Sequence, residues 1–481
     1  MNLRPVGFIL GFLIASLAAA MLLTAVVSVG FGDGQWPAFV LSGSLCVFVS
    51  GQLILGMRQR EVVIDRRQAF LITSLAWLVM PLFGALPLMW SSLRISFTDA
   101  VFEAASGLTT TGATVLVGLD VMPRSVLFWR SLMHWLGGIG IVAMGVAVLP
   151  FLRVGGLQLF RTESSDRSDK VVPRASQFAT AVLGVYLALT VLCAIAYALA
   201  GMSGFDAINH AMSTVATGGF STSDQSLGHY GSAAIEWIAV VFMLSGSLPF
   251  VLYVQALRGR PMLLVRDAQV VTLVGLLAGS SLLVSVWLVV RADIPWPEAI
   301  RMAVFNLTSI VTTTGFASTD YTLWGTSAVM VFMFLTFVGG CTGSTSGGFK
   351  IYRFLVVGQI FRGTAYRMIT PHGVYIATYG GRPIDLDIVK SVATFMIAYF
   401  TAILVLTMAL GMLGLDFETA FSGAATAISN VGPGIGQVIG PAGSFASLPD
   451  AAKWLLGFAM VLGRLEIVTV AVLLIPDFWR G

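Results

Sequence analysis

Ten stretches of this sequence are apolar over a length that can cross a lipid bilayer, for which a helix needs roughly 20 residues. Charged residues make up only 10% of the chain, against about 25% in soluble proteins, so it cannot cover a globular surface in water. The sequence therefore predicts an all-α polytopic membrane protein with ten transmembrane helices. The predicted spans are 6–30, 37–57, 68–91, 125–150, 176–200, 233–257, 268–291, 326–361, 387–413 and 451–476.

The positions of Lys and Arg predict the orientation. Most of the 27 basic residues fall in alternate connecting segments, counted from the N-terminus. Segments rich in these residues stay on the cytoplasmic side, so both termini are expected in the cytoplasm. The first apolar run is long for a signal peptide and is expected to be a retained helix. The net charge of +4 then reflects topology, and we expect contact with membrane lipid and no nucleic-acid binding.

The reactive residue types argue against an enzyme. Cys46, Cys193 and Cys341 are odd in number and include no close pair. The four histidines are scattered, with no two spaced as metal ligands on one helix. The Gly-rich run 137–140 lies inside an apolar span rather than after a strand. We therefore expect a non-enzymatic chain that binds no nucleotide itself.

An internal repeat is the most informative feature of the sequence. Residues 100–112 (AVFEAASGLTTTG) and 303–315 (AVFNLTSIVTTTG) share Ala-Val-Phe and Thr-Thr-Thr-Gly at identical spacing. Two weaker copies, 208–221 and 421–434, place Gly218 and Gly432 in the corresponding position. Each copy lies between two long spans and starts with an acidic residue, which favours a helix N-terminus.

The predicted unit is a span (M1), a short re-entrant pore helix (P), a Thr/Gly turn and a second span (M2). Four such M1–P–M2 units in a pseudo-fourfold arrangement around one pore, plus two extra N-terminal helices, account for all ten spans. The expected boundaries are 1–60 for the two extra helices, 61–155 for repeat 1, 156–262 for repeat 2, 263–370 for repeat 3, with a broken M2 and a gating loop, and 371–481 for repeat 4.

The repeated turn predicts a cation site. A re-entrant helix leaves its C-terminal carbonyls without intrahelical partners, and non-helical backbone at membrane depth must be buried or line a water-filled cavity. A dehydrated cation satisfies such carbonyls, and a ring of four turns provides the oxygens that replace the hydration shell of K⁺. The predicted filter residues are Thr110, Thr111, Gly112, Ala216, Thr217, Gly218, Thr313, Thr314, Gly315, Asn430, Val431 and Gly432. Glu103, near the first turn, either attracts cations or braces its helix.

Two further features predict a gate. The apolar segment 326–361 is too long for one span and contains a Gly/Ser/Thr run, so it is expected to break into a mobile loop. Arg464 lies deep in the last span, where an ionisable residue is by default a functional hypothesis; a buried structural ion pair is the alternative. The predicted gate residues are Gly340, Cys341, Thr342, Gly343, Ser344, Thr345, Ser346, Gly347, Gly348, Lys350 and Arg464.

Taken together, the four units, the run GGCTGSTSGGFKIYR and the GRLE of the last span resemble the Trk/Ktr/HKT superfamily of potassium transporters. The two extra helices and the stretch 134–138 are more like its TrkH/TrkG branch. The resemblance implies uptake of K⁺, as the transported ion, across the bacterial inner membrane. It also implies a homodimer, a cytoplasmic TrkA-like nucleotide-binding regulatory subunit, filter glycines at the four turns, and an Arg464 that faces the gating loop.

The nearest alternative is a Na⁺- or H⁺-coupled secondary cation transporter with alternating access. Such a transporter is built from two halves with broken helices at the midplane, whereas this sequence shows four copies in one orientation. A membrane enzyme would need a cluster of polar catalytic groups, and His134, Arg464 and Glu466 are too scattered to form one. A scaffold subunit would leave the four matched turns unexplained.

Overall fold

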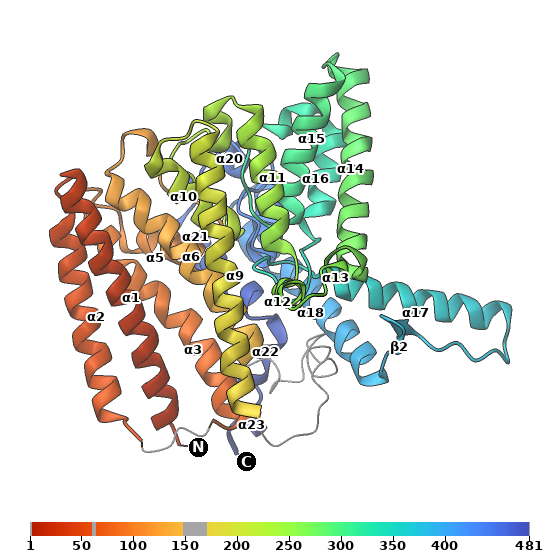
Figure 1. The fold of residues 1–481 in the computed structure, drawn as a ribbon, viewed down its shortest axis with the longest axis horizontal. Coiled ribbons are helices and arrows are strands. Elements are labelled where there is room, and N and C mark those ends of the chain that lie inside the picture. The colour runs from red at the N-terminus through yellow and green to blue at the C-terminus, as the bar shows by residue number, and fades with distance from the viewer. Residues whose placement is uncertain (1, 60–63, 148–170, 481) are drawn as a thin grey trace.

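The computed structural model describes residues 2–59, 64–147 and 171–480, and almost all of its regular structure is helical (Figure 1). Each predicted span coincides with a helix or with consecutive helices. These are α1 (Arg4–Phe31), α2 (Trp36–Gly56), α3 (Arg66–Gly84) with α4 (Leu86–Trp90), α6 (Arg124–Ala147), α9 (Val171–Leu199), α11 (Ala233–Ser247) with α12 (Phe250–Leu257), α14 (Ala268–Ala292), α16 (Thr326–Thr336) with α17 (Ile351–Ile369), α18 (Leu386–Met412), and α21 (Asp450–Arg464) with α22 (Ile467–Leu473).

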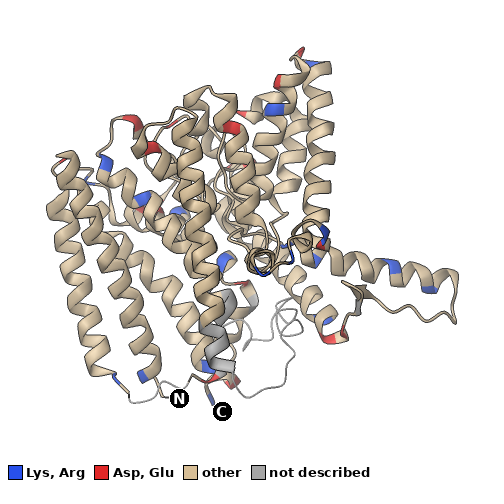
Figure 2. Cartoon of the chain, viewed as in Figure 1, with Lys and Arg blue, Asp and Glu red and all other residues tan. Residues whose placement is uncertain are grey.

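Six helices of the described part are long and apolar enough to cross a membrane alone, and one bent pair makes a possible seventh. Both chain ends lie at the same end of the bundle (Figure 1). Charged residues lie mainly near the two ends of the helices and are sparse between them, as Figure 2 shows. This arrangement is that of a multi-pass membrane protein.

Four short helices lie between the long ones and match the predicted re-entrant segments. They are α5 (Phe97–Leu108), α10 (Gly204–Val215), α15 (Trp296–Val311) and α19 (Phe417–Ser429). At 1.5 Å per residue, helices of 12–16 residues extend about 18–24 Å, which is less than the ~30 Å hydrocarbon core. Shorter elements complete the connections: η1 (Leu119–Val121), η2 (Ser226–Tyr230), α13 (Met262–Arg266), η3 (Tyr321–Trp324), α20 (Gly436–Ile439), η4 (Phe445–Ser447) and α23 (Pro476–Arg480).

Besides the one-residue interruption at Ala85 between α3 and α4, two spans that the sequence predicts as continuous helices are bent or broken. The span predicted at 233–257 bends by 92° between α11 and α12, where Pro249 cannot donate a helical hydrogen bond. The span predicted at 451–476 stops at Arg464, and Glu466 has a φ of 59°, in the left-handed region. The break predicted in 326–361 is confirmed, because α16 ends at Thr336 and helix resumes only at Ile351.

Helix α17 projects sideways from the bundle and forms an arm (Figure 1). A two-residue hairpin, β1 (Thr378–Tyr379) and β2 (Arg382–Pro383), returns the chain to α18. Several large apolar side chains of the arm are exposed: Phe361, Met368, Ile369, Val374 and Ile376.

The N-terminal hairpin α1–α2 is attached to the rest of the bundle through Asp33. Its carboxylate accepts hydrogen bonds from the main-chain N–H of Ser125 at 2.8 Å and of Gln35 at 3.2 Å, and from the hydroxyl of Ser28. Burial of Asp33 would raise its pKa, but these hydrogen bonds outweigh burial and hold the pKa below its usual range. The two extra helices are therefore fixed to α6 by a charge-assisted contact.

Candidate functional site

Three of the four short helices, α5, α10 and α19, begin with a side-chain cap, whereas α15 follows Pro295 and has no side-chain cap. Ser96 and Ser203 each accept a hydrogen bond from the main-chain N–H of the aspartate three residues later, at 3.1 Å. Asp416 caps α19 by accepting from the N–H of Thr419 at 3.0 Å, and these bonds lower its pKa. Side-chain caps of this kind satisfy N–H groups that a helix leaves free.

The chain leaves each short helix through the same backbone conformation. Thr110, Thr217, Thr313 and Asn430 have φ between 51° and 58°. Two residues further on, Gly112, Gly219, Gly315 and Gly432 have φ between 84° and 99°. Only glycine adopts the latter region readily, so the four turns share one geometry.

This geometry corrects the second turn by one residue. The alignment of the internal repeats predicts that Gly218 corresponds to Gly112. In the structure, Gly219 has the equivalent conformation, with a φ of 85°. Gly218 instead corresponds to Thr111, Thr314 and Val431. The two consecutive glycines made both registers possible, and the residue nine positions before the turn glycine becomes His210 rather than Asn209.

The four turns contact one another in a closed ring. A Cβ built on Gly112 would lie 2.2 Å from the carbonyl oxygen of Gly218. The equivalent distances are 2.0 Å from Gly219 to Thr314, 2.1 Å from Gly315 to Val431, and 2.7 Å from Gly432 to Thr111. Each turn therefore packs on the next, and the fourth packs on the first. The glycine Cα atoms lie so close to the neighbouring turn that there is no room for a side chain.

The carbonyl oxygens in these contacts are those of Thr111, Gly218, Thr314 and Val431. None of them accepts a hydrogen bond from a described residue. The C-terminal ends of all four short helices, which carry partial negative charge, meet at the same ring. The ring therefore brings together carbonyl oxygens that no described residue uses as hydrogen-bond acceptors, and such oxygens suit a cation.

A polar side chain of each short helix forms a hydrogen bond with the extended segment that follows its turn. Glu103 accepts from the main-chain N–H of Val115 at 3.0 Å, and Asn306 accepts from that of Ser318 at 3.2 Å. In the other two repeats, His210 lies 3.0 Å from the hydroxyl of Ser221, and Ser422 accepts from the N–H of Ile435 at 3.1 Å. Glu103 is thus a brace, which was one of the two expected roles.

Glu103 also forms a buried ion pair with Arg130 of α6. The Arg130 Nε lies 2.7 Å from a Glu103 oxygen, and the two side chains are 1% and 0% exposed. Arg130 further donates to the carbonyl of Ser221 at 3.0 Å, and its guanidinium lies 4.1 Å from the centre of the Phe220 ring. The His134 ring stacks on the same Phe220 ring, with the two ring centres 4.0 Å apart. These side chains connect the first repeat to the segment just after the second turn.

Two more ion pairs join neighbouring repeats near the starts of the short helices. Lys453 of α21 lies 2.7 Å from Asp99 of α5, and Arg301 of α15 lies 2.7 Å from Glu236 of α11. Both pairs link a short helix to a long helix of an adjacent repeat. The pairings join segments up to 354 positions apart in the chain, so no local sequence pattern indicates them.

The 339–348 loop lies against the ring, as the gate prediction requires. The Thr345 hydroxyl lies 2.9 Å from the carbonyl of Gly246 and 3.1 Å from the Thr217 hydroxyl of the second turn. The N–H of Gly347 donates to the Thr313 hydroxyl of the third turn at 2.7 Å. A Cβ on Gly347 would also lie 2.5 Å from the carbonyl oxygen of Ser429, which precedes the fourth turn.

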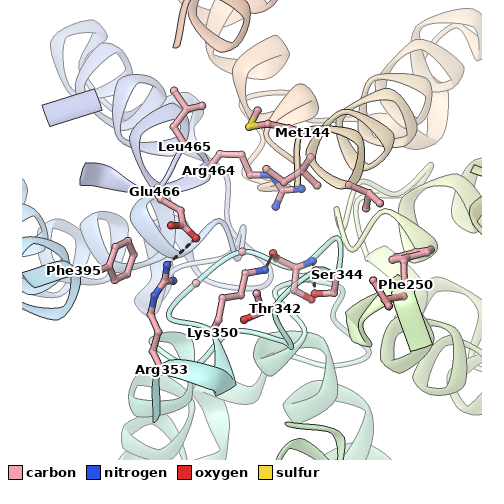
Figure 3. Close-up of a pocket in the computed structure, with 18 of the residues that line it drawn as sticks. Met144, Phe250, Thr342, Ser344, Lys350, Arg353, Phe395, Arg464, Leu465 and Glu466 are labelled. Carbon is pink, nitrogen blue, oxygen red and sulfur yellow. Dashed lines mark hydrogen bonds and ion pairs between the residues drawn. The ribbon is translucent and has the colours of Figure 1, made fainter. Parts of the chain in front are cut away.

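Next to this loop is a cavity of about 70 Å³ that Lys350 and Arg464 both line (Figure 3). The Lys350 ammonium donates to the carbonyl of Ser346. Arg464 does not pair with Glu466, whose carboxylate instead lies 2.7 Å from Arg353. The structural ion pair considered for Arg464 is therefore absent among the described residues, and the two predicted gate cations lie at one cavity.

The sequence did not indicate several residues that the structure places at the site. Phe220 and Arg130 carry no motif, and Thr345 was one residue of a run whose partners were unknown. His210 was visible only after the turn register was corrected. Pro249, by contrast, does indicate from the sequence the bend between α11 and α12. This bend brings α12 beside the loop, where the N–H of Phe250 donates to the carbonyl of Gly343 at 3.0 Å.

The fold and the site define a class: helical membrane proteins in which four short helices converge on one ring of turns. Comparison with known proteins identifies the family to which the chain belongs. The family model of TrkH, described as a cation transport protein, matches residues 35–480. The chain therefore belongs to the TrkH family.

Individual relatives agree along the whole length. The Trk system potassium uptake protein TrkI of Halomonas elongata is 46% identical over 477 residues, which cover 99% of this chain and 97% of the relative. TrkH of Escherichia coli K12 is 36% identical, with 100% of both chains covered. The crystal structure of the potassium transporter TrkH from Vibrio parahaemolyticus matches with a TM-score of 0.93 and 36% identity, again over 100% of both chains.

Proposed function

We propose that this chain takes up K⁺ across the bacterial inner membrane through one pore that passes the ring of four turns. The observation that carries the proposal is the closed ring itself, with its four carbonyl oxygens that accept no hydrogen bond from a described residue. Dehydration of K⁺ is costly, and oxygen rings of this type replace the lost hydration. Relatives that share the full length of the chain are named potassium uptake proteins.

In this proposal the filter residues are Thr110, Thr111, Gly112, Thr217, Gly218, Gly219, Thr313, Thr314, Gly315, Asn430, Val431 and Gly432, and Ala216 precedes the second turn. Four M1–P–M2 repeats, with boundaries as expected from the sequence, surround the pore in pseudo-fourfold order, and ten spans cross the membrane. Both termini are cytoplasmic, which is supported by their location at one end of the bundle (Figure 1).

The 339–348 loop acts as the gate of the proposed pore. Its contacts with three of the four turns support this role, because a segment in that place obstructs a path through the ring. Lys350 and Arg464 add positive charge at the cavity beside the loop and oppose the passage of a cation. Movement of the loop would open the path.

Two partners complete the proposal. A second copy of the chain forms a homodimer, for which the apolar arm of α17 offers exposed surface. A cytoplasmic TrkA-like subunit binds the regulatory nucleotide, since this chain carries no nucleotide motif. The chain itself transports the ion and catalyses no reaction.

Uptake of ⁸⁶Rb⁺ into proteoliposomes that contain the purified protein tests the function. Competition by K⁺ and little effect of excess Na⁺ are expected from a selective pore. Uptake that requires a Na⁺ or H⁺ gradient would favour the alternative, a coupled secondary transporter. A variant that lacks residues 340–348 is the control for a closed gate: if it also fails to take up Rb⁺, the proposed function is wrong.

A further inference from the structure

The cavity beside the loop contains more positive than negative charge. Its charged lining residues, within the described part of the chain, are Lys350, Arg353, Arg464 and Glu466. Arg353 lies 2.7 Å from Glu466 and 3.7 Å from the centre of the Phe395 ring, so these two charges compensate each other. Lys350 and Arg464 form no ion pair with a described residue.

Arg464 is unusual in its surroundings. The residue is 4% exposed, yet none of its three guanidinium nitrogens has a hydrogen-bond partner among the described residues. Figure 3 shows its side chain extending from α21 toward the 339–348 loop, on the side where Lys350 and Ser344 lie. A buried guanidinium without partners is costly, and its planar fork of donors suits an anion.

From this we propose that the cavity binds a small monovalent anion, of which chloride is the abundant example, between Arg464 and Lys350. The cavity volume of about 70 Å³ is several times the roughly 10–15 Å³ that one water requires, so an ion of this size fits. Gly343 and Gly348 line the same cavity, and their main-chain N–H groups donate to no described residue. Water could satisfy these donors but would leave the two positive charges unbalanced.

The bound anion has a consequence for the gate. Arg464 belongs to the fourth repeat and Lys350 follows the loop of the third, so an ion between them links the two. Without the anion, two like charges face each other in a poorly polarisable cavity and repel. We therefore expect the anion to stabilise the closed conformation of the loop. This effect on the gate rests on the proposed function, whereas the existence of the anion site does not.

Anomalous diffraction from crystals grown in bromide tests the site directly. We expect a bromide peak within hydrogen-bonding range of Arg464 and Lys350 that chloride displaces. The peak should vanish in Arg464→Gln and in Lys350→Met and persist in Arg291→Gln, which removes an equal charge from an exposed arginine of α14. A wild-type crystal without a peak in this cavity would overturn the proposal, and this arm needs no variant to fold.

Uptake of ⁸⁶Rb⁺ tests the link to the gate. Basal uptake should be about tenfold lower in chloride than in gluconate when chloride is ten times its dissociation constant, and Arg464→Gln should abolish this dependence. If the bromide peak is present but ⁸⁶Rb⁺ uptake is the same in chloride and in gluconate, the anion site is supported and its effect on the gate is refuted. Absence of uptake even in the 340–348 deletion would instead refute the proposed function.

Discussion

The buried pair of Glu103 and Arg130 allows a quantitative test of how the first turn is held. Glu103→Gln keeps the shape and the hydrogen bond from the N–H of Val115, but it leaves the Arg130 guanidinium charged in a site where only 1% of its side chain is exposed. Such a variant removes the counter-charge without opening a cavity. The expected loss therefore reports the electrostatic contribution of the pair.

Removal of one partner of a buried ion pair costs about 3–5 kcal/mol. For 481 residues at about 2.1 cal/mol/K per residue, the entropy of unfolding is ~1 kcal/mol/K. Glu103→Gln should then lower the melting temperature by ~3–5 °C. The double variant Glu103→Gln/Arg130→Met should recover most of this loss, because replacing both charges is often close to neutral.

The assay is thermal unfolding in detergent, followed by the remaining monodisperse fraction, for wild type, both single variants and the double variant. Glu298→Gln is the matched control, since Glu298 is 52% exposed and lies 3.7 Å from Arg301; it should cost less than ~1 kcal/mol. If Glu103→Gln behaves like Glu298→Gln, or if the double variant loses the sum of the singles, the pair does not hold the turn electrostatically.

Three further expectations follow from the site. Gly219→Ala should reduce the preference of ⁸⁶Rb⁺ uptake for K⁺ over Na⁺, because its Cβ would meet the Thr314 carbonyl at 2.0 Å, whereas Gly279→Ala meets no atom within 4 Å and should change nothing. Thr345→Val removes the hydroxyl contacts that hold the loop, and a loss of ~1–2 kcal/mol would raise basal uptake about five- to thirtyfold; unaltered uptake would argue against the gate. The pKa of Asp416 is lowered, so its cap stabilises α19 fully above the ordinary Asp pKa of about 3.9, and this stabilisation is lost as the pH falls below that value. Asp416→Asn should therefore show a smaller fall in melting temperature than wild type when the pH is lowered through this range.

Local patterns were sufficient for most of the architecture. Apolar length placed the long helices, the acidic starts placed the short ones, and the repeated Thr/Gly pattern placed three of the four turns in their observed register. The break in 326–361 followed from its length against the bilayer thickness. Each of these inferences depends on residues close together in the chain, where sequence and structure are most directly related.

The remaining features depend on contacts between distant segments. Adjacent glycines at 218 and 219 make the register of the second turn ambiguous in the sequence, and the positive φ angles of Thr217 and Gly219 resolve it. The sequence could not pair Glu466 with Arg353, because the two residues lie in segments more than a hundred positions apart. The brace in the fourth repeat moves to Ser422, since Gly423 has no side chain to supply it.

The closed ring of four turns is made by one continuous chain, so the segments around the four turns can differ from one another in sequence and structure. In an assembly of four identical subunits, a loop beneath the ring would occur four times, and so would an arginine beside it. Among the described residues, the segment after α16 supplies the loop and Lys350, and the end of α21 supplies Arg464, so the loop and this arginine come from different parts of the chain. Covalent linkage of the repeats thus lets each diverge toward a separate task while the shared turn geometry is retained.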